Sequence, residues 1–181
     1  MNLQPSPSAA PIALTPAQGA ALLRATLAAM QLLVENAPGT FLAWQPAPGE
    51  WSVVEVIGHL VETEERGFGG RIRAIMAEDR PQFSGWDPDG VAAARADATR
   101  DPAEVLAEFT ARREANIAML EGLSPDILDR GGDHPEVGEL TGRALLQEWV
   151  YHDGNHIRQM HANLQAYTWP HMGNAQRFGG G

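Results

Sequence analysis

The sequence predicts an all-α protein, a four-helix bundle with long connections. Four long segments repeat their apolar residues with the period of an amphipathic α-helix. Each segment begins after a serine, threonine or aspartate that can cap a helix, and proline- and glycine-rich stretches separate the segments. No segment alternates apolar and polar residues far enough to predict a strand of useful length.

The first helix is predicted over residues 16–36. Thr15 supplies a capping oxygen, and Pro16 suits the first helical position, where its missing N–H leaves no bond unmade. The apolar stripe ends before Pro38-Gly39, which is a typical helix stop.

The second helix is predicted over residues 53–76. Ser52 and Glu55 have the spacing of a capping box. The three glycines within 67–70 weaken the middle of this helix by about 1 kcal/mol each relative to alanine. They indicate close helix packing, a kink or a break, and the pattern does not decide among the three.

The third helix is predicted over residues 102–123 and the fourth over 142–167. Asp101, followed by a proline, is the cap of the third, and Thr141 is the cap of the fourth. An alanine-rich piece, residues 91–98, predicts a short helix in the connection that precedes the third.

The chain is expected to form one domain. Residues 1–15 are rich in proline, serine and alanine and predict a flexible lead-in. Residues 16–170 hold the four helices, joined between the last two by a long connection, 124–139. Residues 171–181 end in glycines and predict a loose tail.

Composition excludes several classes of function. The net charge is −10, which argues against a nucleic-acid or anionic-membrane partner, because such surfaces need a basic stripe. The chain has no cysteine, so disulfides, thiolate nucleophiles and cysteine-based zinc sites are excluded. Lysine is absent too, which excludes Schiff-base chemistry. Neither a signal peptide nor a membrane span is expected, and a cytoplasmic location is the default expectation.

Three histidines are the main functional signal. His152 and His156 are four residues apart in the fourth helix, so both project from one face of it. His59 lies on the apolar side of the second helix. Three imidazoles from two helices can hold one metal ion and leave positions open for water or substrate, which is typical of a catalytic site. A single histidine on an apolar face is more often a hydrogen-bonded core residue, but three buried together leave several ring nitrogens in need of partners.

Other residues are candidates for roles beside the metal. Glu62 follows His59 by three residues and is the preferred catalytic carboxylate, as a fourth ligand, a partner of an imidazole or a general base. Gln159 is one turn beyond His156 and could bind a ligand, although a surface role fits equally well. Trp86, in the connection after the second helix, could overhang a pocket. A ferritin-like di-iron site is excluded because no glutamate has a histidine three residues later.

Two motifs resemble those of the DinB-like superfamily, also known as the DinB/YfiT group of metal-dependent four-helix-bundle proteins. They are Trp51-Ser52-x-x-Glu55-x-x-Gly58-His59-Leu60 and Tyr151-His152-Asp153-x-x-His156-Ile157-Arg158-Gln159.

The resemblance covers most of residues 16–167 and implies a four-helix bundle. It implies that His59, His152 and His156 bind one divalent metal ion, zinc or nickel. Relatives include transferases that use low-molecular-weight thiols, so such a thiol is a candidate cofactor. A small-molecule substrate and a homodimer are further implications.

Three functions remain open at this point. The first is a mononuclear metalloenzyme, a thiol transferase or a hydrolase acting on a small molecule. The second is a non-enzymatic, stress-related or regulatory bundle in which the metal only joins two helices. The third is a bundle without metal whose histidines are core residues. Imidazole ligands suit zinc, nickel, copper and iron alike, so the sequence does not identify the metal.

Overall fold

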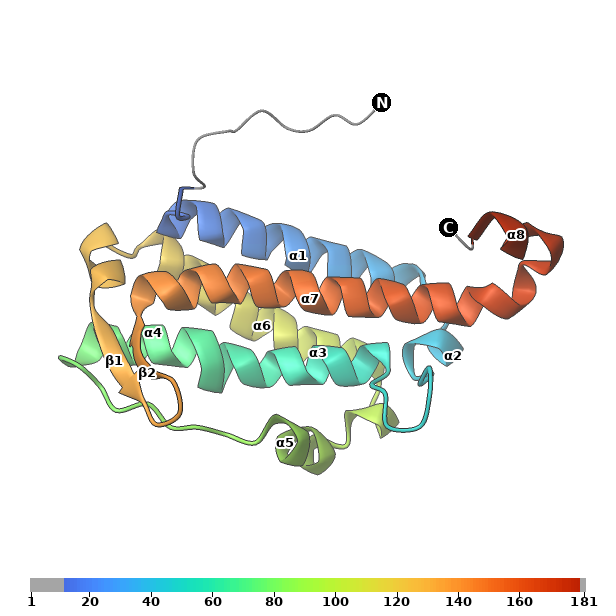
Figure 1. The fold of residues 1–181 in the computed structure, drawn as a ribbon, viewed down its shortest axis with the longest axis horizontal. Helices are drawn as coiled ribbons and strands as arrows, with labels where there is room; N and C mark the ends of the chain where they lie inside the picture. The colour runs from blue at the N-terminus through green and yellow to red at the C-terminus, as the bar shows by residue number, and fades with distance from the viewer. Residues whose placement is uncertain (1–11, 180–181) are drawn as a thin grey trace.

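The computed structural model describes residues 12–179, and these form a bundle of four long helical segments (Figure 1). One pair of helices, α1 and α7, lies against the α3–α4 segment and α6. The predicted all-α four-helix bundle is therefore confirmed. The segments are α1 (Pro16–Asn36), α3 (Val53–Glu62) continued by α4 (Phe68–Ala77), α6 (Pro102–Glu121) and α7 (Gly142–Thr168).

The expected caps start the long helices. The Thr15 and Ser52 side chains each take part in a full capping box, in which the third helical residue returns a bond to the cap backbone. Asp101 accepts from the Ala103 amide at 2.9 Å, and Thr141 accepts from the amide three residues on. These bonds satisfy amides that a helix leaves free at its first turn.

The second predicted helix continues through its glycines by way of a π-helical turn, Thr63–Gly67. A Cβ on Gly69 would overlap the Asn116 side chain, and one on Gly70 would overlap the Glu65 carbonyl oxygen. The segment is therefore continuous, without a break. Close packing and one extra residue in the turn explain the glycines, and such turns are frequent at functional sites.

The connection from α4 to α6 returns along the length of the bundle, because these two helices run in the same direction (Figure 1). It carries α5 (Pro88–Arg95) and a 3₁₀ turn, Asp97–Thr99. The short helix predicted over 91–98 thus begins earlier and ends earlier than expected, because Asp87 caps it and Pro88 opens it. A shorter helix, α2 (Gly39–Leu42), lies in the connection that follows α1.

The connection between α6 and α7 contains a small hairpin that the sequence did not predict. A 3₁₀ turn, Pro125–Asp129, precedes the antiparallel strands β1 (Gly131–His134) and β2 (Gly138–Thr141). Each strand has four residues, too few for a recognisable alternation. The hairpin also bonds to the connection from α4 to α6, which we call the crossover, since the Phe83 amide donates to the Asp133 carbonyl at 2.8 Å.

Short helical turns follow α7 at the C-terminal end. They include two 3₁₀ turns and α8 (Gln176–Gly179), within the segment expected to be a loose tail. Of the expected lead-in, residues 1–11 lie outside the described part of the chain, as do residues 180–181.

Length and composition alone would allow α1 to cross a membrane, a property that the sequence analysis did not anticipate. In the bundle, however, Ala20, Leu23, Leu27 and Met30 of this helix are buried against other helices. Such burial accounts for one apolar stripe of α1, while Leu22 and Leu32 of the same helix are exposed.

The core consists of two apolar clusters, one toward each end of the bundle. Between them each long segment carries polar side chains. On α1, Thr26 lies between Leu23 of one cluster and Leu27 of the other. On α6, Arg113 occupies the corresponding place, and on α7 this level contains His152, Asp153 and His156.

Candidate metal centre

The three predicted histidines meet between α3 and α7. The Nε2 atom of His152 lies 3.3 Å from Nε2 of His59 and 3.2 Å from Nε2 of His156. One nitrogen from each ring lies within 4.8 Å of the other two. The structure thus brings together, around one point, side chains that are far apart in the sequence.

Local structure explains this convergence. The capping box at Ser52 fixes the start of α3, so the helical phase of His59 is set against α7. The four-residue spacing on α7 stacks His152 and His156 on the same face. His59 is 8% exposed, and the other two rings are partly buried.

The donor set fits a divalent ion such as zinc. In a tetrahedral site with Zn–N bonds of about 2.0–2.1 Å, neighbouring nitrogens are separated by about 3.3 Å. The two Nε2 separations in this site, 3.2 and 3.3 Å, match that spacing. Three imidazoles leave at least one coordination position without a protein ligand from this set.

The histidines are held in the neutral form that metal binding requires. Burial, together with the nearby His156 and His152 rings, lowers the pKa of His59 to about 3. Burial, with the charge of a neighbouring His156, lowers the pKa of His152 to about 4. Burial also lowers the pKa of His156, against the opposing bond to Gln159. Near neutral pH all three rings are uncharged, so each has a nitrogen lone pair available.

The second nitrogens of the rings differ in their partners. His156 Nδ1 lies 2.9 Å from Gln159 Oε1. Gln159, which the sequence indicated as a residue that could bind a ligand, therefore orients the His156 imidazole. Among the described residues, the Nδ1 atoms of His59 and His152 are buried without a hydrogen-bond partner.

Aromatic side chains enclose the histidines. Trp86 stacks on His59 with ring centroids 5.8 Å apart, and Trp51 packs against the same ring at 5.0 Å. Phe68 meets His152 edge-on at 5.2 Å. These rings exclude water from one side of the site and hold the imidazoles in place.

Glu62 lies in an ion-pair cluster. Its carboxylate accepts from Arg66 at 2.6 Å and from Arg95 at 2.9 Å. Burial opposes its ionisation, but the two arginines outweigh that effect, so the pKa of Glu62 lies below its usual range. Glu62 is therefore a carboxylate held in its charged form, and its catalytic role stays a prediction.

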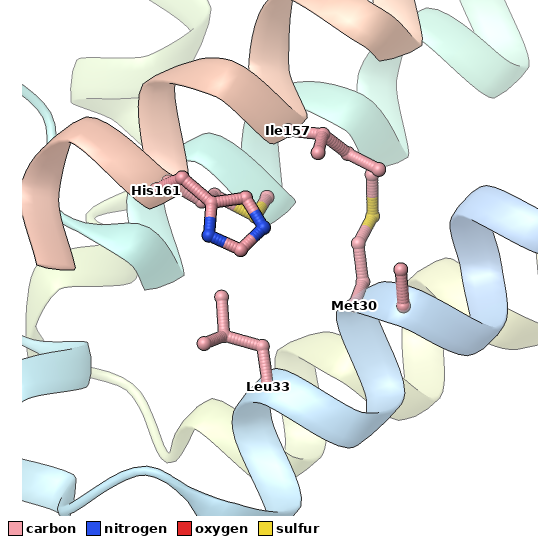
Figure 2. Close-up of a pocket in the computed structure, with 6 residues that line it drawn as sticks. Met30, Leu33, Ile157 and His161 are labelled. Atoms are coloured by element: carbon pink, nitrogen blue, oxygen red, sulfur yellow. The ribbon is translucent and has the colours of Figure 1, made fainter.

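His161 faces away from the three-histidine site. It points from α7 into a small pocket shared with Met30, Leu33 and Ile157, shown in Figure 2. That pocket has a volume of about 10 Å³, which is room for about one water molecule. Replacing His161 therefore changes a histidine of the same helix without touching the three-histidine site, which makes it a suitable control.

A buried ion cluster next to the site was not predicted. It consists of Glu64, Arg113 and Asp153, all three without exposed side-chain surface. Arg113 donates to both oxygens of Asp153, at 2.5 and 2.9 Å, and to Glu64 at 2.7 Å. The only available signal was helical phase, because Arg113 falls four residues after Phe109 on the apolar stripe of α6.

The fold and the site together define a four-helix bundle with a candidate three-histidine metal centre on the facing sides of two helices. Comparison with protein families agrees with this class. The family model of the DinB superfamily matches residues 22–160 of the chain. The chain therefore belongs to the DinB superfamily.

Similar proteins support the same assignment. YfiT of Bacillus subtilis (strain 168), a curated relative, is 26% identical over 110 residues, which are 60% of this chain and 61% of YfiT. The match thus spans about three-fifths of that relative's length. The solved structure of YfiT from Bacillus subtilis is described as a probable metal-dependent hydrolase with an unusual four-helix bundle topology. It superposes with a TM-score of 0.77 at 22% identity, covering 92% of this chain and 94% of YfiT.

A second solved structure shares the fold. TT2238, described as a four-helix bundle protein, has a TM-score of 0.60 at 19% identity. The match covers 82% of this chain and 99% of TT2238. At these identities the two solved structures support the fold.

Proposed function

We propose that this protein is a mononuclear metalloenzyme in which His59, His152 and His156 bind one divalent metal ion. The observation that supports this most directly is the meeting of three neutral imidazoles, with His152 Nε2 at the nitrogen spacing of a tetrahedral site from both His59 and His156. Zinc or nickel is the proposed metal. The description of YfiT as a probable metal-dependent hydrolase is consistent with a metal in this superfamily.

The proposed reaction is a hydrolysis or a thiol transfer on a small molecule. A divalent ion in such a site lowers the pKa of a bound water or thiol and so supplies a nucleophile at neutral pH. The chain has no thiol of its own, so in the transferase form a low-molecular-weight thiol is the proposed second substrate.

Protein side chains have defined parts in this proposal. The three histidines leave a position open, Gln159 orients His156, and Trp51 and Trp86 limit access of bulk water. Glu62 is proposed to manage the proton. Its arginine partners keep it ionised, which weakens it as a base, so its contribution would include orienting a ligand as well as accepting a proton.

Elemental analysis of protein purified without an affinity tag tests the metal assignment. We expect wild type to contain about one equivalent of divalent metal and His152→Ala to lose it, because a three-ligand site cannot keep its geometry with two. His161→Ala, on the same helix but outside the site, is the matched control and should keep its metal. Metal retained in full by His152→Ala would refute the assignment.

Treatment with a chelator separates the enzyme from the structural alternative. Two apolar clusters hold the helices together without help from the site, so the metal-free protein should keep its helical circular dichroism. If instead the metal only joins α3 and α7, chelation should unfold the bundle, as it does in proteins whose folding depends on a metal.

A further inference from the structure

A cavity of about 310 Å³ opens beside the histidines, between the α3–α4 segment and the crossover that precedes α5. Phe83 and Trp86 give it apolar walls, and Gln82 and Ser84 add polar groups. It is far larger than the pocket of about 10 Å³ between α1 and α7 in Figure 2. A small organic molecule fits a cavity of this size and mixed lining.

Arg71 of α4 lines this cavity with a guanidinium that is poorly satisfied. Its single hydrogen bond within the described residues is a long one, 3.4 Å from Nη2 to the Ser84 carbonyl oxygen. Its Nε atom is buried and has no partner there. A buried donor without an acceptor costs about 1–3 kcal/mol, which a bound acceptor would recover.

Arginines elsewhere on the cavity lining and nearby are already paired. Arg66 bonds to Glu62, and Glu65, the one carboxylate of the lining, bonds to Arg112 at 2.9 Å. Arg71 makes no ion pair within the described part of the chain. Arg71 is therefore the arginine of the cavity lining that has no carboxylate partner within the described residues, in a chain whose net charge is −10.

The cavity and the histidine site share a wall. Trp86 lines the cavity and also stacks on His59 with a centroid separation of 5.8 Å. Burial lowers the pKa of Arg71, and the negative charge of Glu148, one helical turn before His152, opposes that effect. The Phe83 ring lies under the Arg71 guanidinium, with Cζ 5.8 Å from the ring centroid.

We infer that this cavity is a binding subsite for the carboxylate of a small organic acid, in which Arg71 recognises the charge and Phe83 and Trp86 contact the apolar body. A planar guanidinium matches a carboxylate by two parallel hydrogen bonds, which gives both affinity and orientation. The inference builds on the proposed function, since it names the substrate class of the histidine site as carboxylic acids.

A matched pair of probes tests the subsite in the metal-free full-length protein. Benzoate and benzamide have nearly the same shape, and they differ in charge. Binding is measured by ligand-observed NMR titration on wild type, on Arg71→Gln and on Arg177→Gln. Arg177 is an exposed arginine near the C-terminal end, so its replacement removes the same charge outside the cavity.

We expect wild type and Arg177→Gln to bind benzoate at least about tenfold more tightly than benzamide, because a charge-assisted pair adds that much. Arg71→Gln should lose the preference while keeping its melting temperature within a few degrees. Equal binding of the two probes by wild type, no binding of benzoate, or an unchanged preference in Arg71→Gln would overturn the inference.

Metal content separates this inference from the proposed function. Arg71→Gln should retain its metal, because Arg71 is not one of the three histidine ligands. A protein that prefers benzoate but binds no metal would keep the carboxylate subsite and refute the metalloenzyme. A protein that binds metal but shows no preference would do the reverse.

Discussion

Glycine at position 70 illustrates how a single residue controls the course of a helix. In the π-helical turn the Glu65 carbonyl oxygen occupies the space in which a Cβ on Gly70 would lie. By contrast, Gly154, in the interior of α7, has no atom within 4 Å of its Cβ position. The same residue type thus meets a steric requirement in one helix and none in the other.

Alanine substitutions at these two glycines should have opposite effects. We expect Gly70→Ala to lower the free energy of unfolding by about 1–3 kcal/mol, because the backbone must move to admit the methyl group. Gly154→Ala should raise it by about 0.5–1 kcal/mol, as alanine loses less backbone entropy in a helix. Urea denaturation of the metal-free proteins measures both, and equal effects would contradict the steric role of Gly70.

At the scale of elements, the buried ion cluster joins three parts of the bundle. Glu64 comes from the π-helical turn, Arg113 from α6 and Asp153 from α7. The Trp149 indole also donates to Glu64, at 3.0 Å, and Thr26 of α1 bonds to Asp153. The cluster fixes the relative position of helices that carry His59 and His152, because misplaced helices would leave buried charges unpaired.

Replacing Arg113 tests this cluster, with its neighbour as the control. We expect Arg113→Met to cost about 3–5 kcal/mol of stability, since two carboxylates would remain buried without their partner. Arg112→Met removes ion pairs with Glu65 and Glu108 near the protein surface and should cost about 0–1 kcal/mol. The difference is read from guanidinium denaturation midpoints, and a small effect at both positions would show that the cluster adds little.

For the whole molecule, the acidic character is partly balanced by ion pairs that bind the crossover to the bundle. Glu108 of α6 accepts from Arg95 at 3.0 Å and from Arg100 at 3.2 Å. Bonds from these arginines hold the pKa of Glu108 at about 2, below its usual value of 4.5, against the effect of burial. The homodimer and the cytoplasmic location expected from the sequence stay predictions.

The depressed pKa of Glu108 predicts a pH dependence with a definite sign. Above pH 4.5 the carboxylate is ionised in the folded and the unfolded chain, and its pairing stabilises the fold in full. As pH falls from 4.5 toward 2, the unfolded chain takes up the proton first and this stabilisation is lost.

Comparing Glu108→Gln with wild type isolates that effect from the other carboxylates. We expect the variant to be less stable by about 1–2 kcal/mol at pH 6, a value reduced by solvent screening of the pair. The difference should shrink toward zero near pH 2. A difference that stays constant across this range would show that the pairs with Arg95 and Arg100 do not stabilise the fold.

The sequence by itself determined the long helices and the three histidines that meet between two of them. Caps at Thr15, Ser52 and Thr141 fixed where helices start, because capping is a local interaction between residues three apart. The phase of His152 and His156 was likewise local, since it follows from helical geometry. The third histidine was found because its helix had a clear apolar face.

Only the tertiary structure decided what distant residues do to one another. The glycine run over 67–70 and the helical phase of Arg113 are the only local signs of the roles of Gly70 and Arg113, and Arg71 has none. A steric overlap, an unpaired donor and a buried charge depend on atoms from other turns or helices. The hairpin over 131–141 was missed for a similar reason: its short strands gain their stability from each other and from the crossover, by hydrogen bonds between segments far apart in the chain.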